Sequence, residues 1–275
     1  MMAKRRLVSL GKHISAILFM VFMLLPFFLV LVNSLKPRID IIKNPLALPQ
    51  TLSLANYAKA WATMKFGHVL MNTVYITAFS QIFLISFGAM LSYLLVRWNW
   101  KINKYIFTLL ICAMIIPFQS LMIPFVSIFG KLGFMNSRTA LIFFYMGFGM
   151  PMTTFMYHGF MKGISKEMEE AALIDGCSHF YCFWKIVFPN LKPITTTILI
   201  VNILWIWNDF LLPSLVLIKD KNRTIPLSTF YFFGEYTAEL GLAMAALILS
   251  VLPVVVIYLF LQKQIVTGVM DGAIK

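Results

Sequence analysis

Residues 162–192 read KGISKEMEEAALIDGCSHFYCFWKIVFPNLK, a charged segment enclosed on both sides by long apolar runs. Before it, Asp, Glu, Lys and Arg are missing from Thr139 to Met161, and after it residues 194–218 are interrupted only by Asp209. Runs this long and this poor in charge are typical of membrane-spanning helices, whereas the charged segment between them belongs in water. The contrast predicts a polar loop that joins two membrane spans.

Similar apolar runs recur through the 275 residues of the chain, of which 60% are hydrophobic and only 12% are charged. A bilayer core of roughly 30 Å needs about 20 residues of helix to cross it. The runs are continuous rather than alternating, which disfavours a β-barrel, and they lack the polar face that soluble helices keep. We therefore predict an all-α integral membrane protein, a single domain over residues 1–275, with six transmembrane helices. The expected spans are residues 13–32, 72–96, 105–129, 140–160, 194–218 and 241–262.

The basic residues near the N-terminus predict the orientation of the chain. Lys4, Arg5, Arg6 and Lys12 precede the first apolar run, which favours a cytoplasmic N-terminus, and six spans return the C-terminus to the same side. The first run is too long for the apolar part of an ordinary signal peptide, so we expect an uncleaved span. Several basic residues would lie on the opposite side and weigh against this orientation: Lys36, Arg38, Lys43, Lys59 and Lys65.

Local signals within residues 162–192 predict two short helices joined by a sharp turn. Ser165 is a good N-cap for a first helix with an acidic first turn, and Gly176 readily adopts the left-handed conformation that ends a helix. Ser178 can cap a second helix, which we expect Pro189 to stop. The second helix is predicted to carry one apolar stripe, formed by Phe180, Phe183, Trp184, Val187 and Phe188.

This segment resembles the EAA loop of the permease subunits of bacterial ATP-binding-cassette importers. The resemblance is carried by Glu170-Ala171-Ala172, Asp175-Gly176, Ile186 and Pro189, at the spacing of the family and between the fourth and fifth spans. One departure is Cys177, where alanine is usual; both residues are small. The resemblance implies a MetI-like permease fold in which residues 162–192 form a coupling-helix loop that docks onto an ATPase. The implied contacts are Glu170, Ala171, Ala172, Asp175, Gly176, Ile186 and Pro189.

A wider resemblance, over nearly the whole chain, is to the carbohydrate-uptake branch of that family and its maltose-type permeases. It is carried by Leu54-Ala55-Asn56-Tyr57, Asn72-Thr73, Trp207-Asn208-Asp209-Phe210 and the tail Gly268-Val269-Met270-Asp271-Gly272-Ala273. In such relatives the short C-terminal tail reaches the ATPase pair. The resemblance therefore implies a second ATPase contact at Gly268, Asp271 and Gly272.

The resemblance implies the transmembrane subunit of an importer for a sugar or oligosaccharide, working by alternating access in a bacterial plasma membrane, and not an enzyme. The implied partners are a second permease in a heterodimer, two copies of an ATPase, an extracytoplasmic solute-binding protein and membrane lipid. The chain has no G-x-x-x-x-G-K-[ST] sequence, so we expect no cofactor here and ATP with Mg²⁺ on the separate ATPase subunits. Its basic residues are spread over the loops, which disfavours nucleic acid, and Cys177, His179 and Cys182 do not follow a zinc-site spacing.

Asp209 is the only acidic residue within the predicted spans, and burying a charge there is costly. On a helix, Asn202, Trp205 and Asp209 share a face, with Asn208 on its flank. Two interpretations are open. These four residues could contact a sugar, which offers apolar ring faces and hydroxyls, or Asp209 could hold neighbouring helices near the outer end of the span. We favour the second, and consider Gln119 and Tyr75 weaker candidates for substrate contact.

Two alternatives for the function stay open. The first is an importer permease of the same family for a solute that is not a sugar, such as glycerol phosphate. Such an anion would call for Arg or Lys at depth, which the predicted second to sixth spans lack, although a partner subunit could supply them. The second is a stand-alone secondary carrier, which would more often bury several ionisable groups along its path.

Overall fold

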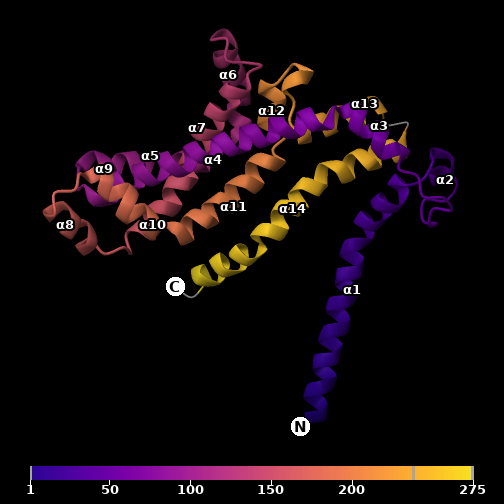
Figure 1. Ribbon diagram of the computed structural model, residues 1–275, viewed down its shortest axis with the longest axis horizontal. Helices are drawn as coiled ribbons and strands as arrows, with labels where there is room; N and C mark the ends of the chain where they lie inside the picture. The colour runs from indigo at the N-terminus through magenta and orange to yellow at the C-terminus, as the bar shows by residue number, and fades with distance from the viewer. Residues whose placement is uncertain (1, 237–238, 274–275) are drawn as a thin grey trace. The chain divides into compact units, whose positions relative to one another are not determined.

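The computed structural model describes the backbone of residues 2–236 and 239–273, and the side chains of residues 11–232, 239–260 and 262. Within these residues all regular secondary structure is helical (Figure 1), so the predicted fold class is confirmed. The first half contains α1 (Met2–Ser34), α2 (Arg38–Lys43), α3 (Ala55–Met64), α4 (Phe66–Arg97), α5 (Lys101–Ile115), α6 (Phe118–Lys131) and α7 (Arg138–Met161). The second half contains α8 (Glu167–Ile174), α9 (His179–Cys182), the π-helical turn η1 (Phe183–Val187), α10 (Phe188–Asn190), α11 (Lys192–Asn208), α12 (Leu211–Val216), η2 (Asp220–Asn222), α13 (Ile225–Tyr236) and α14 (Leu240–Ala273).

Four helical segments of the described chain are each long and apolar enough to cross a membrane: Gly11–Ser34, Phe66–Arg97, Arg138–Met161 and Leu240–Phe260. Two further pairs satisfy the same condition only as bent units, α5 with α6 at 102° and His179–Asn190 with α11 at 78°. The described chain thus has four to six candidate spans. The six expected spans agree with the upper count in number, but the bent pair counted as the fifth begins at His179, in the segment expected to be a loop, and ends at Asn208 rather than at residue 218.

Two of the expected spans are less regular than the sequence suggested. The third, residues 105–129, was expected as one transmembrane helix, but it is broken at Ile116 and Pro117 because the residue before a proline is driven out of the helical region. The fifth, residues 194–218, was expected to be continuous. Its helix ends at Asn208, where the backbone of Asp209 becomes extended, and the short helix α12 follows.

The described chain divides into two compact units, one formed by residues up to 67 with 228–253, the other by residues 68–227 with those from 254 onward. The single domain expected over residues 1–275 stays a prediction. In the first unit Asn56, from the Leu54–Tyr57 segment, donates its amide to the carbonyls of Ser34 and Lys36, each at 2.9 Å, and so satisfies the end of α1. In the Leu54–Tyr57 segment, Asn56 thus stabilises the C-terminal end of α1.

The second unit is organised around α7, which packs against both α5 and α11 (Figure 1). Small and polar residues set the close contacts of α7 with its neighbours. A Cβ added at Gly149 would lie 2.9 Å from a methyl of Leu84 and 3.1 Å from the ring of Trp205. Ser92 on α4 donates to the carbonyl of Thr154 at 2.9 Å. Small residues and hydrogen bonds of this kind hold helices together where the surroundings are as apolar as the helices themselves.

Candidate functional site

The EAA-like segment forms two helices joined by a tight turn. The Ser165 hydroxyl accepts a hydrogen bond from the Glu167 amide at 3.2 Å just before α8, and Ser178 accepts one from the Tyr181 amide at 3.3 Å to cap α9. Between the two helices Gly176 has φ +85°, a conformation that costs glycine little. The predictions for Gly176 and Ser178 are confirmed. Ser165 is not the N-cap of α8, because that position is Lys166, whose side chain makes no capping hydrogen bond.

The second helix ends at Asn190, one residue after Pro189, and the chain bends by 78° before α11 begins at Lys192. Most of the predicted apolar stripe is also formed. Phe183 and Val187 are buried, Trp184 and Phe188 pack against the same cluster, and Phe180 at the start of the helix is 66% exposed. The helix is not regular throughout, because residues 183–187 form the π-helical turn η1.

A buried ion pair fixes this segment to the end of α4. One carboxylate oxygen of Glu169 lies 2.6 Å from Arg97 Nη2 and accepts a hydrogen bond from Nε at 2.8 Å. The other oxygen accepts a hydrogen bond from the Tyr93 hydroxyl at 3.1 Å, and Arg97 also donates to the carbonyl of Ile164. Both charged side chains are only 7% exposed. Because two charges removed from water need each other, this contact determines where α8 lies.

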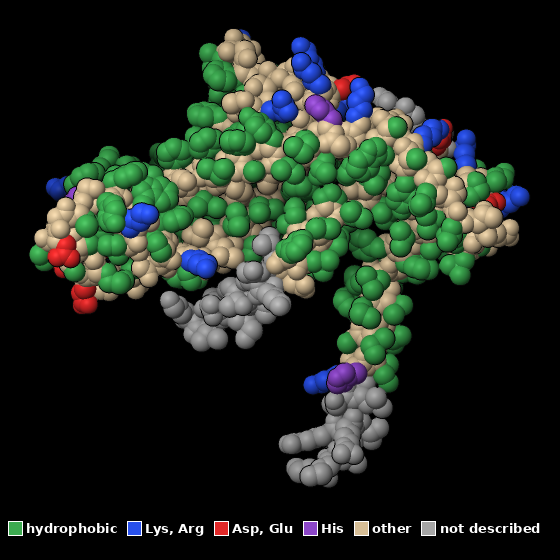
Figure 2. Space-filling view, in the orientation of Figure 1, with side chains coloured by type: hydrophobic (Ala, Val, Ile, Leu, Met, Phe, Trp, Pro, Cys, Tyr) green, Lys and Arg blue, Asp and Glu red, His purple; other side chains and the backbone are tan. Residues whose placement is uncertain are grey.

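The two faces of α8 differ in burial: one packs against the rest of the chain and the other is exposed. Glu169 and Ala172 are buried, and Ala172 packs in a cluster that includes Tyr157 and Phe183. The opposite face, with Glu170, Ala171 and Asp175, is exposed, and Figure 2 shows acidic side chains at this end of the molecule. Of the predicted coupling residues, Ala172 thus faces its own chain, Ile186 is half-buried, and Glu170, Ala171, Asp175, Gly176 and Pro189 are exposed.

Reasoning from the sequence missed Glu169 as a site residue. Arg97 could have indicated it, because a cation at the end of an apolar span needs an acidic partner. The neighbouring Cys182 is fully buried, and burial together with the nearby Glu169 carboxylate raises the pKa of its thiol. Among the described residues no group of three or more His, Cys, Asp or Glu side chains could hold a metal ion.

The predicted C-terminal contact at Gly268, Asp271 and Gly272 lies outside the residues whose side chains are described. The backbone there continues α14.

The candidate pathway residues of the fifth span do not act as one group. Asn202 is buried and donates to the Thr153 hydroxyl at 3.0 Å, and Asn208 donates to the carbonyl of Leu204. Asp209 accepts from the Tyr145 hydroxyl at 3.0 Å and from the Leu211 amide at 2.9 Å. Its carboxylate thus joins α7 to the break between α11 and α12, which supports the helix-holding interpretation.

Trp205 and Asp209 nevertheless border a cavity of about 720 Å³, and Gln119 lies in its wall. Trp205 is 39% exposed and packs edge-on against Tyr145, with the ring centres 5.5 Å apart. The rest of the lining is mainly apolar, with several phenylalanines. An aromatic wall with a few polar groups suits a ligand with apolar faces and hydroxyls.

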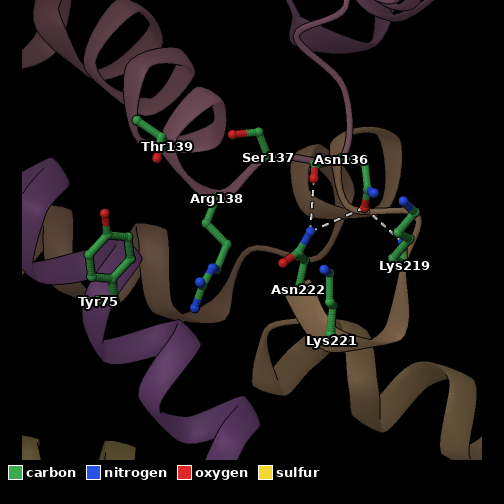
Figure 3. A pocket seen from close by; sticks show the side chains of 8 residues that line it. All are labelled: Tyr75, Asn136, Ser137, Arg138, Thr139, Lys219, Lys221 and Asn222. Carbon is green, nitrogen blue, oxygen red and sulfur yellow. Dashed lines mark hydrogen bonds between the residues drawn. The ribbon is translucent and has the colours of Figure 1, made fainter.

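A second, polar pocket of about 310 Å³ lies where α4 and α7 begin and where the loop after α12 passes (Figure 3). Asn72 holds this region together. Its amide donates to the carbonyls of Lys221 and Arg223 at 2.9 and 3.0 Å, and its oxygen accepts from Arg138 at 2.6 Å. Thr73 accepts from the Ile225 amide at 2.9 Å. The Asn72-Thr73 pair of the recognised pattern therefore anchors the loop after α12 to α4.

Asn136 supports the same loop from the other side. Its backbone is left-handed, with φ +59°, and its side-chain oxygen accepts from the Lys219 amide at 2.9 Å. Its carbonyl accepts from the Asn222 amide at 2.8 Å, as Figure 3 shows. Sequence reasoning did not single out this pocket, because its residues come from three separate segments.

Comparison with known proteins agrees with this architecture. A family model described as "Binding-protein-dependent transport system inner membrane component" matches residues 84–270. The chain is 44% identical over 273 residues to the probable starch degradation products transport system permease protein AmyC of Thermoanaerobacterium thermosulfurigenes, covering 98% of this chain and 99% of that one. It is 39% identical to the melibiose/raffinose/stachyose import permease protein MelC of Bacillus subtilis, over 91% of each chain.

A solved structure shares the fold. It is a crystal structure of a bacterial ATP-binding-cassette transporter involved in the import of the acidic polysaccharide alginate. The similarity has a TM-score of 0.78 at 20% sequence identity and covers 94% of this chain and 96% of that one.

Proposed function

The chain belongs to the family of binding-protein-dependent transport system inner membrane components, and from this premise we propose which solute it carries and how it is driven. Members are permease subunits of ATP-binding-cassette importers, so the chain is a multi-pass inner-membrane transporter subunit and not an enzyme. The importer works with an extracytoplasmic binding protein. The solute is a sugar or an oligosaccharide.

The sugar assignment is supported by relatives that match along nearly their whole length. Their names specify starch degradation products and melibiose, raffinose and stachyose. The aromatic cavity beside Trp205 and Gln119 is chemically suited to such a ligand, because sugar rings stack on aromatic faces and their hydroxyls need a few polar partners. Glycerol phosphate is the less favoured solute, since no Lys or Arg lines this cavity.

Coupling to ATP hydrolysis occurs at the exposed face of α8. Glu170, Ala171 and Gly176 meet an ATPase subunit, while Glu169 and Ala172 hold the same helix to the membrane helices. The observation that carries this assignment is the asymmetry of α8, one face locked by a buried ion pair and the other open. A rigid link of this kind is needed if movement of the ATPase is to move the spans.

We assign the remaining partners accordingly. A second permease completes the pathway, two ATPase copies lie on the side of α8, and the tail around Gly268, Asp271 and Gly272 adds a second contact. Both termini are cytoplasmic. Transport follows alternating access, in which ATP and the loaded binding protein favour the outward-facing state because they bind it more tightly than the inward-facing one.

The test is to purify the tagged chain in mild detergent and identify the proteins that accompany it. We expect a second six-span permease and a P-loop ATPase. In reconstituted vesicles, the loaded binding protein with maltooligosaccharides or raffinose should stimulate ATP hydrolysis, whereas glycerol phosphate should not. Recovery of the chain alone, with solute uptake that is insensitive to ATP, would instead support a stand-alone carrier.

A further inference from the structure

The pocket in Figure 3 gathers positive charge without a counter-ion. Arg138, Lys219 and Lys221 contribute to its wall, and none of its eight lining residues is acidic. Among the described side chains, the ion pairs are Lys59–Glu239, Arg97–Glu169 and Arg223–Asp220, so these three cations take part in none. A cleft lined by one sign of charge concentrates ions of the opposite sign. The pocket is therefore suited to an anionic group.

The backbone around the pocket is held independently of the lysine side chains. The carbonyl of Lys221 accepts from His68 at 2.7 Å as well as from Asn72, and the amide of Lys219 is fixed by Asn136. The two lysine side chains are exposed, whereas Arg138 is half-buried and lies 5.5 Å from the centre of the Tyr75 ring. The two lysine charges are thus presented by a framework that does not need them for its own structure, whereas Arg138 belongs to that framework through its hydrogen bond to Asn72.

The position of the pocket along α4 matches the depth of lipid headgroups. Tyr75, in its wall, and Arg97, in the ion pair with Glu169, both belong to α4 and are 22 residues apart in the sequence. At about 1.5 Å per residue the helix between them is about 33 Å long, close to the thickness of the hydrocarbon core. Figure 2 shows basic side chains beside α12, at the end of α4 opposite to α8.

An exposed aromatic stripe runs along α4 from the same pocket. Tyr75, Phe79, Phe83 and Phe87 are spaced by four residues and so lie on one face of the helix. Their exposed fractions are 37, 42, 37 and 48%. The Tyr75 and Phe79 rings lie 4.7 Å apart, and those of Phe83 and Phe87 stack at 6.0 Å. A cationic pocket thus continues into an apolar track directed toward the membrane interior.

We propose that this surface is a binding site for an anionic phospholipid. The headgroup phosphate lies in the pocket against Lys219, Lys221 and Arg138, and an acyl chain lies along Phe79, Phe83 and Phe87. Soluble phosphate shares the headgroup chemistry but would make no use of the aromatic stripe. The proposal rests on the membrane-spanning fold and not on the identity of the transported solute.

The headgroup is tested by native mass spectrometry of the purified protein complex titrated with phosphatidylglycerol or with phosphatidylcholine of the same acyl chains. We expect phosphatidylglycerol to bind more tightly. Lys221→Gln should weaken its binding about fivefold, and Lys219→Gln with Lys221→Gln about 25-fold, since one basic residue near an anionic membrane surface contributes about a factor of five. Lys131→Gln removes an exposed charge outside the pocket and should have little effect. Equal binding of the two lipids, or equal weakening by Lys131→Gln, would overturn the proposal.

The acyl-chain contact is tested by Phe79→Ala combined with Phe83→Ala. This variant should weaken phosphatidylglycerol binding, whereas Phe19→Ala with Phe22→Ala, which removes two exposed rings from α1, should not. A parallel titration with inorganic phosphate separates the two sources of the anion. Phosphate binding as tight as that of the lipid, and unaffected by the α4 variant, would assign the pocket to a soluble anion and overturn the lipid assignment.

Discussion

Replacing Glu169 with alanine tests whether the ion pair with Arg97 holds α8 in place. The substitution removes the Arg97 and Tyr93 contacts together and leaves Arg97, 7% exposed, with only the Ile164 carbonyl. Breaking a buried ion pair by removing one partner costs about 3–5 kcal/mol. Each 1.4 kcal/mol is a factor of ten, so the detached state of the loop should become roughly a hundredfold or more populated.

Limited trypsin digestion of the assembled importer measures the population of the detached state, because the cleavage rate of a segment that opens and closes rapidly follows the population of its open form. Lys162, Lys166 and Lys185 are exposed cleavage sites in or beside the segment. We expect Glu169→Ala to accelerate cleavage at these sites and to abolish stimulation of ATP hydrolysis by the loaded binding protein. Glu170→Ala is the matched control, since its side chain is exposed on the same helix, and it should impair stimulation without accelerating cleavage.

A double variant separates the charge from the packing. Arg97→Met with Glu169→Met replaces the pair by apolar side chains and should restore most of the resistance to trypsin, because such replacements of buried ion pairs are often neutral. Wild-type cleavage and stimulation in Glu169→Ala would refute the role given to this pair.

Three further predictions concern single positions. Gly176→Val should abolish uptake without preventing membrane insertion, since a left-handed backbone at φ +85° costs other residues roughly 1–2 kcal/mol. Gly176→Asn should retain part of the activity. Normal uptake by the valine variant would contradict the coupling assignment. Gly149→Ala should destabilise the protein by about 1–3 kcal/mol through overpacking against Leu84 and Trp205, which is measured as a lower Tm. Gly147→Ala, at a position with open space around it, should leave the Tm unchanged. Equal Tm values for the two variants would show that Leu84 and Trp205 adapt to the added methyl group. Cys182 should react with iodoacetamide much more slowly than the half-buried Cys177 at neutral pH, because burial raises the pKa of its thiol and only the thiolate reacts. Its rate should increase as the pH rises. Equal rates for the two cysteines would place Cys182 at the surface.

The helical membrane architecture could be predicted from the sequence because it depends on composition over long windows. A run such as residues 139–161, without Asp, Glu, Lys or Arg, has few alternatives to a buried helix. Local signals also succeeded where one residue decides the geometry. Gly176 ends α8 and Ser178 caps α9 through contacts within three residues of the chain.

The predictions failed where distant contacts or helix phase decide the outcome. A regular helical period was expected from Phe180 to Phe188, and the π-helical turn at Phe183–Val187 interrupts it, although four of the five apolar residues still share one cluster. Glu169 was regarded only as one of several acids in a first turn, because nothing in its neighbourhood reveals that Arg97, 72 residues earlier, lies against it. The pocket around Arg138 combines residues from positions 75, 136–139 and 219–222, and no local pattern links them.

The two ends of α4 show why polar contacts matter in so apolar a chain. Apolar side chains can slide past one another at little cost, since each position offers similar contacts, whereas hydrogen bonds and ion pairs are made at one position only. At one end Asn72 fixes the loop that contains Lys221 and Arg223, and at the other Arg97 fixes α8 through Glu169. The position of the long helix between them is therefore fixed relative to both the loop of residues 217–224 at one end and α8 at the other. Under the proposed coupling, a displacement of α8 by an ATPase would act on α4 through Arg97, and α4 is bonded directly to the loop of residues 217–224 at its other end.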